Sequence, residues 1–174
     1  MSQETKTQDR PLLEAIRSVG ITFFTGVPDS AFKELIAQLE EHELDQRYVL
    51  ADREDNALAL ACGAWLAGHR PLVFLESSGL GNAIDALTSL AGAYEIPIVL
   101  LIGWAGYKGR DVPHHNAIGE PLEGLLDALG VPMLQVPLAD HEAVASVIAD
   151  AAELAADARR PAAVLGIPPD LADG

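Results

Sequence analysis

The sequence is poor in basic residues. It has 174 residues, with 11 Lys and Arg against 26 Asp and Glu, and its formal net charge is -15. Nucleic acids and anionic membrane surfaces are bound by clustered cations, so this composition argues against both as partners. A small anionic substrate is compatible with the composition, because a few local cations are enough to bind one.

Cysteine, aromatic residues and long apolar runs are also scarce. The one cysteine, Cys62, cannot form a disulfide within the chain, and its Ala-rich surroundings favour a small core residue over a nucleophile. With few aromatics, the core is expected to consist of Ala, Leu, Ile and Val. No leader segment opens the sequence and no run of about 18 apolar residues occurs, so we expect a soluble, cytoplasmic protein.

What the sequence does contain is a regular alternation of apolar runs and helical segments. The expected strands are 21–25, 48–50, 71–75, 96–102, 132–136 and 162–165. Several of them lack polar alternation, and helical segments of about ten residues or more separate most of them. This pattern predicts an α/β fold, a doubly wound parallel sheet flanked by helices. We expect one domain over residues 9–170, with tails at 1–8 and 171–174.

Most of the unusual residues follow the ends of expected strands. The four junctions concerned are 26–30, 52–56, 76–82 and 103–119. In a parallel sheet they share the edge at which such folds bind ligands. At the second junction, Glu54 lies between two other charged residues at the start of a helix. These charges either complement the helix dipole or take part in binding.

Two of these junctions leave alternatives open. Residues 79–82 (Gly-Leu-Gly-Asn) resemble the start of a dinucleotide-binding fingerprint, but its third glycine is missing. His114 and His115 lie in an expected long loop, where they could act as acid and base or simply face solvent. Because no third ligand has zinc-like spacing, we expect no metal bound by this chain.

Four motifs together resemble the pyrimidine-binding domain of thiamine-diphosphate decarboxylases. The motifs are Gly26-Val27-Pro28-Asp29-Ser30, Glu54-Asp55-Asn56-Ala57, Ser78-Gly79-Leu80-Gly81-Asn82 and residues 97–104. Each is weak alone, but their order and spacing match, and the similarity runs from about Arg10 to Pro168. The group of sulfopyruvate and phosphonopyruvate decarboxylases looks most similar. His114-His115 also resembles the paired histidines of pyruvate decarboxylases.

The resemblance implies roles for individual residues. Glu54 would hydrogen-bond the aminopyrimidine ring of the cofactor and favour its imino tautomer. The remaining residues expected to surround the cofactor are Ser78, Gly79, Gly81 and Asn82. The further candidates for catalysis are Asp29, His114 and His115. The candidates for substrate binding are Ser30, Arg53, Lys108 and Arg110.

The resemblance also implies a reaction and a partner. The expected reaction converts 3-sulfopyruvate, a small anionic 2-oxo acid, to sulfoacetaldehyde and CO2; phosphonopyruvate or another 3-substituted pyruvate is the alternative substrate. Such enzymes hold Mg2+ and the diphosphate on a second domain marked by Gly-Asp-Gly, and this sequence has no Gly-Asp dipeptide. We therefore expect a separate beta subunit, in an α2β2 or larger hetero-oligomer.

The sequence leaves open two hypotheses that assign the chain to other classes of protein. One is a non-catalytic interaction module derived from such a domain, although Glu54 and the histidine pair would then have no reason to be present. The other is a flavodoxin-like or Rossmann nucleotide-binding protein, which bound flavin would reveal.

Overall fold

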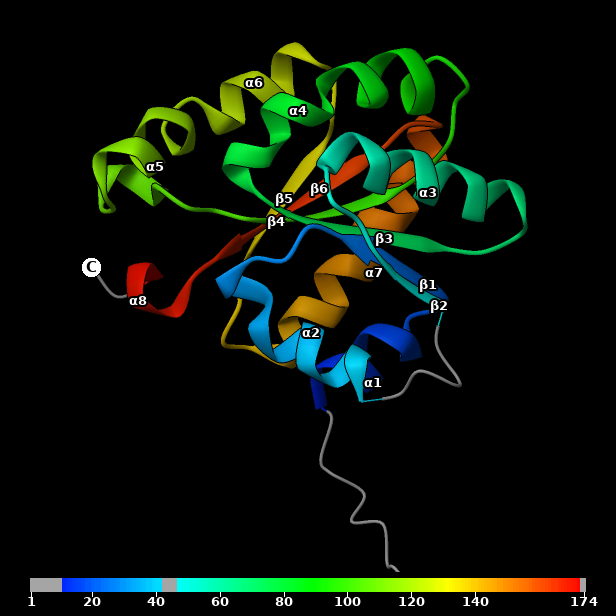
Figure 1. The fold of residues 1–174 in the computed structure, drawn as a ribbon, viewed down its shortest axis with the longest axis horizontal. Helices are drawn as coiled ribbons and strands as arrows, with labels where there is room; N and C mark the ends of the chain where they lie inside the picture. The colour runs from blue at the N-terminus through cyan, green and yellow to red at the C-terminus, as the bar shows by residue number, and fades with distance from the viewer. Residues whose placement is uncertain (1–10, 42–46, 173–174) are drawn as a thin grey trace, which may run out of the picture.

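A computed structural model describes residues 11–41 and 47–172 (Figure 1). The expected tail at residues 1–8 lies outside these ranges, as do residues 173 and 174. Across the two described ranges, no helix combines the length and the apolarity that a membrane crossing requires.

Six parallel strands form a single sheet in the order β2-β1-β3-β4-β6-β5. The strands are β1 (Phe23–Gly26), β2 (Arg47–Leu50), β3 (Pro71–Glu76), β4 (Val99–Gly103), β5 (Met133–Pro137) and β6 (Ala162–Ile167). The prediction of a parallel α/β sheet is therefore confirmed, and each strand lies within a few residues of its expected position.

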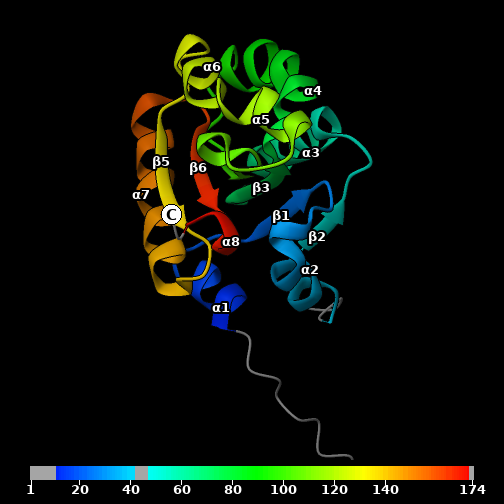
Figure 2. The ribbon, with the colours of Figure 1, turned by 90° about the vertical axis from the view of Figure 1, so that its left-hand side faces the viewer.

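Helices cover both faces of this sheet (Figure 1). One layer contains α1 (Pro11–Ser18), α2 (Lys33–Glu40) and α7 (His141–Ala158). The other contains α3 (Glu54–Leu66), α4 (Leu80–Asp85), α5 (Pro113–Gly119) and α6 (Leu122–Ala128). Shorter turns are η1 (Ser30–Phe32), η2 (Ser77–Gly79), a π-helical η3 (Ala86–Gly92) and η4 (Tyr107–Gly109). A last helix, α8 (Pro169–Ala172), follows β6 (Figure 2).

The central strands are apolar on both sides because each side has its own core. On β3, Leu72 and Phe74 pack with α1, α2 and α7, whereas Val73 and Leu75 pack with α3, α4 and α6. Alternate residues of a strand point to opposite faces, so a strand covered on both faces needs apolar residues throughout. Cys62 lies buried in α3, where burial raises the pKa of its thiol to about 11, as expected for a core residue.

The strand order creates a crevice between β1 and β3. The chain leaves β1 toward β2 on one side, and after α3 it returns to form β3 on the other side of β1. The connections after β1 and β3 therefore diverge to opposite faces, which in open parallel sheets opens a ligand crevice at the carboxyl edge. Asp29 and Glu76 lie at this point in the fold.

The expected long loop at 103–116 is the main difference from the sequence prediction. The segment contains η4 and the start of α5, so His114 and His115 lie in a helix. Pro113 suits the first turn, and the Asn116 amide donates to the carbonyl oxygens of Gly109 (3.2 Å) and Asp111 (2.9 Å). The sequence also predicts a helix near 119–129, and α6 occupies this position. Helix α8 had no counterpart among the expected elements.

A pair of glycine substitutions tests the close packing of β1 on β3. A side chain at Gly26 would collide with the backbone oxygen and ring of Phe74. Gly26→Ala should therefore lower the free energy of unfolding by about 1–3 kcal/mol, the usual cost of overpacking. As a control, Gly63→Ala in α3 meets nothing within 4 Å and should raise it by about 0.5–1 kcal/mol. Urea denaturation followed by circular dichroism measures both, and a Gly26→Ala protein as stable as the parent would contradict this packing.

Candidate active site

Glu54 lies where the start of α3 meets the glycine-containing turn after β3. Its Oε2 atom accepts a hydrogen bond of 2.9 Å from the Asn82 amide of α4. A side chain added at Gly79 would place its first carbon 2.5 Å from Glu54 Oε1. Glycine at position 79 thus lets the backbone of η2 approach the carboxylate, and Asn82 holds the carboxylate in position.

The chemistry of this group is that of a positioned acceptor. Glu54 is half-buried, and a carboxylate has more lone pairs than the single amide of Asn82 occupies. The remaining lone pairs can accept an N–H group from a ligand. The structure therefore brings together Glu54, Gly79 and Asn82, three of the residues predicted from the sequence.

A pocket of about 620 Å³ opens at the carboxyl edge of the sheet. The polar residues lining it are Asp29, Ser30, Lys33, Glu34, Glu76, Asp111, His115 and Asp170. They come from the connections after β1 and β4, from the end of β3 and from α8. The pocket thus lies at the crevice that the strand order creates between β1 and β3.

Asp29 is fixed at the entrance to the turn η1. Its Oδ1 atom accepts a hydrogen bond of 2.8 Å from the backbone N–H of Ala31, as the N-cap of that turn. Gly103, at the end of β4, leaves room for the carboxylate, because a side chain there would begin 3.3 Å from Oδ1. Burial raises the pKa of Asp29, and the neighbouring Glu76 raises it further.

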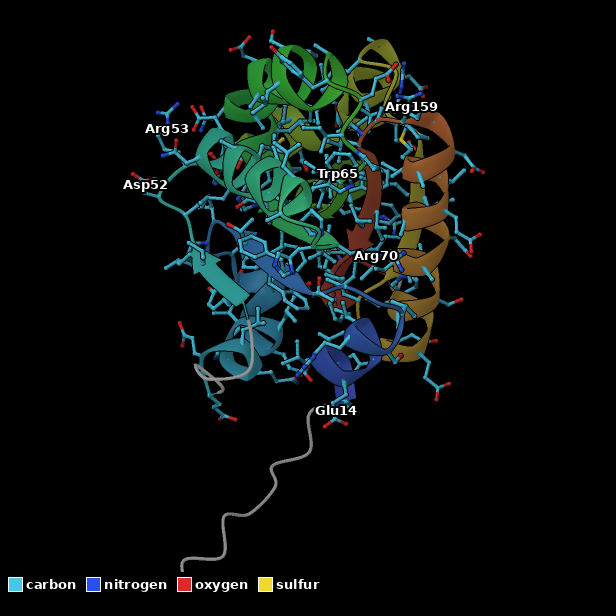
Figure 3. All side chains as sticks on the ribbon, turned by 90° about the vertical axis from the view of Figure 1, so that its right-hand side faces the viewer. Glu14, Asp52, Arg53, Trp65, Arg70 and Arg159 are labelled. Carbon is cyan, nitrogen blue, oxygen red and sulfur yellow. The ribbon has the colours of Figure 1, made fainter. Side chains whose placement is uncertain are left out.

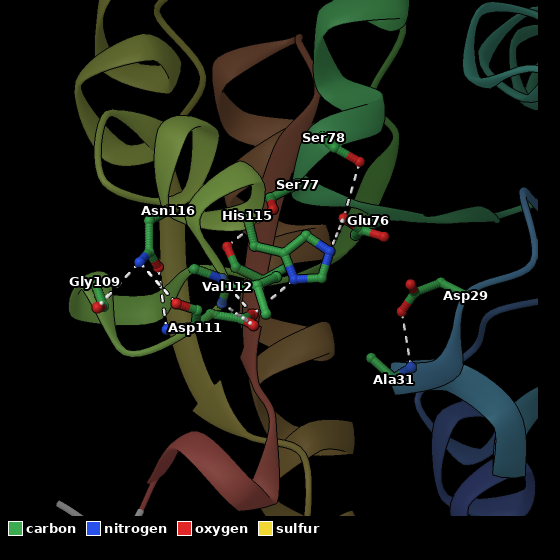
Figure 4. A network of polar contacts seen from close by, with 12 residues as sticks. Asp29, Ala31, Glu76, Ser77, Ser78, Gly109, Asp111, Val112, His115 and Asn116 are labelled. Atoms are coloured by element: carbon green, nitrogen blue, oxygen red, sulfur yellow. Dashed lines mark hydrogen bonds and ion pairs between the residues drawn. The ribbon is translucent and has the colours of Figure 1, made fainter.

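His115 is oriented by Asp111. Its Nδ1 atom lies 2.9 Å from Asp111 Oδ2 (Figure 4). Hydrogen bonds from the backbone N–H groups of Gly106 and Val112 lower the pKa of Asp111, so this carboxylate is charged and acts as the acceptor. Nδ1 of His115 therefore carries the proton, and Nε2 faces Glu76 Oε1 at 3.8 Å.

Other predicted residues lie away from this pocket. The exposed Arg53 pairs with Asp55 at 3.0 Å and extends outward from α3 (Figure 3). Lys108 places its Nζ atom 4.9 Å from the centre of the Tyr107 ring. Arg110 and His114 are exposed, and the His114 ring packs edge-on against His115 with centroids 4.4 Å apart.

Ser78 and Gly81, two more residues predicted to bind the cofactor, lie in surroundings different from those of Glu54. The Ser78 hydroxyl donates a 2.9 Å hydrogen bond to Glu76 Oε1, on the pocket side of the turn. Gly81 is exposed on α4, with open space where a side chain would begin.

Several residues of the site were missed in the sequence. Asp111 could have been found, since it precedes His115 by four residues, a spacing that brings side chains together around a helix start. Glu76 is the last residue of β3 and therefore lay on the expected edge. Lys33 and Asp170 gave no comparable signal, because their place in the pocket depends on how α2 and α8 pack.

The comparisons with known proteins agree with this geometry. The family described as "Thiamine pyrophosphate enzyme, N-terminal TPP binding domain" matches residues 7–119. The sulfopyruvate decarboxylase subunit alpha of Methanococcus maripaludis is 30% identical over 152 residues, which cover 87% of this chain and 89% of that subunit. The phosphonopyruvate decarboxylase of Streptomyces viridochromogenes is 34% identical over 127 residues, 72% of this chain and 32% of that protein.

A solved structure shows the same arrangement. The thiamine diphosphate-dependent 4-hydroxybenzoylformate decarboxylase of Rhodococcus jostii RHA1 matches with a TM-score of 0.60 and 26% identity, over 92% of this chain and 29% of that one. The chain thus spans most of the alpha subunit but only about a third of the two longer enzymes. It belongs to the thiamine pyrophosphate enzymes, as their N-terminal TPP binding domain.

Proposed function

We propose that this chain is the alpha subunit of a cytoplasmic, thiamine-diphosphate-dependent 2-oxo acid decarboxylase that converts 3-sulfopyruvate to sulfoacetaldehyde and CO2. The observation that carries the proposal is the Glu54 carboxylate, held by Asn82 and approached by the backbone at Gly79. The aminopyrimidine ring of thiamine diphosphate has the N–H groups that such an acceptor binds. When bound, the cofactor takes up the electron pair released as CO2 leaves.

The residues of the pocket supply proton transfer and orientation. Asp29 and His115 line the pocket beside the crevice, and both can carry a proton to the carbon that has lost CO2. Ser30 and Lys33 line the same pocket and are our candidates for contacts with the substrate's acidic group. Arg53, Lys108 and Arg110 lie outside this pocket in the described residues, so cations of a partner would complete that contact.

The partner is proposed from the relatives. The chain covers 89% of the Methanococcus maripaludis protein named as subunit alpha, whereas it covers 32% of the phosphonopyruvate decarboxylase. A beta subunit would supply the ligands for Mg2+ and the diphosphate, and Glu54 would reach the cofactor across the interface. Each active site then needs one domain of each kind, which favours α2β2 or a larger closed assembly.

Phosphonopyruvate is the second candidate substrate. The phosphonopyruvate decarboxylase of Streptomyces viridochromogenes is 34% identical over its matched region, against 30% for the Methanococcus alpha subunit. Sulfonate and phosphonate are both tetrahedral anions, and the two substrates would occupy the same pocket. Comparing kcat/KM for the two substrates in the assembled enzyme decides between them.

Glu54→Gln should reduce turnover to a small residual rate without unfolding the chain. The amide can form hydrogen bonds, but it cannot balance the positive charge on a protonated ring nitrogen, so a fall of about 10²–10⁴-fold is expected. Exchange of the cofactor C2 proton, followed by NMR in the assembled enzyme, is the direct measurement. Glu142→Gln, the same change in the first turn of α7, is the matched control. Near-normal exchange in Glu54→Gln would remove Glu54 from this role.

His115→Ala should slow decarboxylation or product release by about 100-fold while cofactor affinity changes far less. The reason is the position of Nε2, which faces the pocket while Asp111 holds Nδ1. Single-turnover kinetics at saturating cofactor measures the effect. His114→Ala is the comparison, and its effect should be smaller because His114 lies outside the pocket lining. Equal activity of His115→Ala and the parent would refute the role of His115.

The isolated chain should neither bind thiamine diphosphate tightly nor decarboxylate a 2-oxo acid. The groups proposed to hold Mg2+ and the diphosphate belong to the beta subunit, and these groups carry most of the cofactor's charge. Calorimetry with Mg2+ and thiamine diphosphate, with and without the beta subunit, tests this. Micromolar binding together with turnover by this chain alone would contradict the split-enzyme proposal.

A further inference from the structure

Glu76 lines the same pocket as both proposed proton carriers, Asp29 and His115, and the reaction as described so far does not use it. It is the last residue of β3, and its side chain is 27% exposed, which leaves it accessible from the pocket. Figure 4 shows it between Asp29 on one side and His115 on the other. Its Oε1 atom lies 3.8 Å from His115 Nε2, and Glu76 and Asp29 line the same pocket.

The register of the sheet accounts for this placement. Glu76 of β3 pairs with Gly103 of β4. Because Gly103 has no side chain, nothing at this position separates Glu76 from Asp29. The connection after β1 brings Asp29 to the same place, where the Ala31 N–H fixes it. The carboxyl groups of Asp29, after β1, and Glu76, at the end of β3, therefore lie in the same pocket.

Two adjacent carboxyl groups do not both ionise readily. Like charges at short range favour one shared proton over two negative charges. The Ser78 hydroxyl donates a hydrogen bond to Glu76 Oε1. The burial of Asp29 disfavours its own charge, and its pKa is raised accordingly. Burial and the like charge of Glu76 together favour the proton on Asp29.

We propose that Glu76 is a positioning residue that keeps a proton on Asp29 and links Asp29 to the His115–Asp111 pair, so that Asp29 can act as the acid of the reaction. This inference rests on the proposed decarboxylation. As CO2 leaves, the carbon that held it needs one proton. The O–H bond of Asp29 breaks as the new C–H bond forms, which leaves Asp29 and Glu76 both charged. One proton then returns from water through His115 and restores the pair.

Other charged groups face the pair from every surrounding element. These groups are Lys33 and Glu34 of α2, Asp111 and His115 of the segment after β4, and Asp170 of α8. Asp111 is charged and already bonded to two backbone N–H groups, so it does not compete for the proton. Among the described carboxylates, the neighbouring Glu76 is the one that raises the pKa of Asp29.

Glu76→Gln tests the proposal, because it keeps the shape of the side chain and removes the charge. The pKa of Asp29 should then fall, since the charge that opposes its ionisation is gone. NMR titration of the Asp29 carboxyl carbon in the full chain measures this without cofactor or turnover. Asp170→Asn is the control, because it removes one charge from the same pocket, and the titration of Asp29 should stay where it is in the parent. An unchanged titration in Glu76→Gln overturns the proposal.

The assembled enzyme supplies the second readout. An acid must be protonated to work, so the rate falls as pH rises through its pKa, and in Glu76→Gln this fall should occur at lower pH. At neutral pH, kcat should drop roughly tenfold or more, while KM changes less. A parent assembly without decarboxylase activity would refute the proposed function and, with it, the catalytic role of Glu76. An active parent with an unshifted pH profile in Glu76→Gln would refute the role of Glu76 alone.

Discussion

The parallel register of β1, β3 and β4 is the constraint on which the site depends. Their carboxyl ends stop at one edge, and the chain departs from β1 and β3 in opposite directions. Glycines at positions 26, 79 and 103 then allow backbone and carboxylates to approach one another more closely than any side chain would permit. The polar residues are concentrated at this edge because the remainder of the sheet is enclosed by two apolar cores.

Much of this arrangement could be predicted from the sequence. Strands buried on both faces are continuous apolar runs, so their positions, their parallel pairing and the shared edge follow from composition alone. Glu54 and Asn82 were predicted together because their motifs resemble those of a known family. Their direct contact could not be predicted from the sequence. Only the fold shows that Gly79 lies against the same carboxylate.

The rest depends on packing and on side-chain direction, which sequence patterns do not encode. Helix α5 has no apolar stripe from which it could be predicted. The hydrogen bonds that stabilise its start join Asn116 to residues five and seven positions earlier in the chain. Arg53 and Lys108 were expected near the substrate from the family resemblance, yet each lies against a neighbour in its own segment. The place of Glu76 in the site becomes evident only when β3 is paired with β4.

The buried thiol of Cys62 has a practical consequence for work on the assembly. With its pKa raised to about 11, the group stays protonated and enclosed in the core, so it reacts slowly with thiol-directed reagents. The native chain therefore contributes little background to cysteine labelling. A fluorophore or spin label attached to a single cysteine introduced on the exposed surface of α3 or α4 would report subunit docking from one known position.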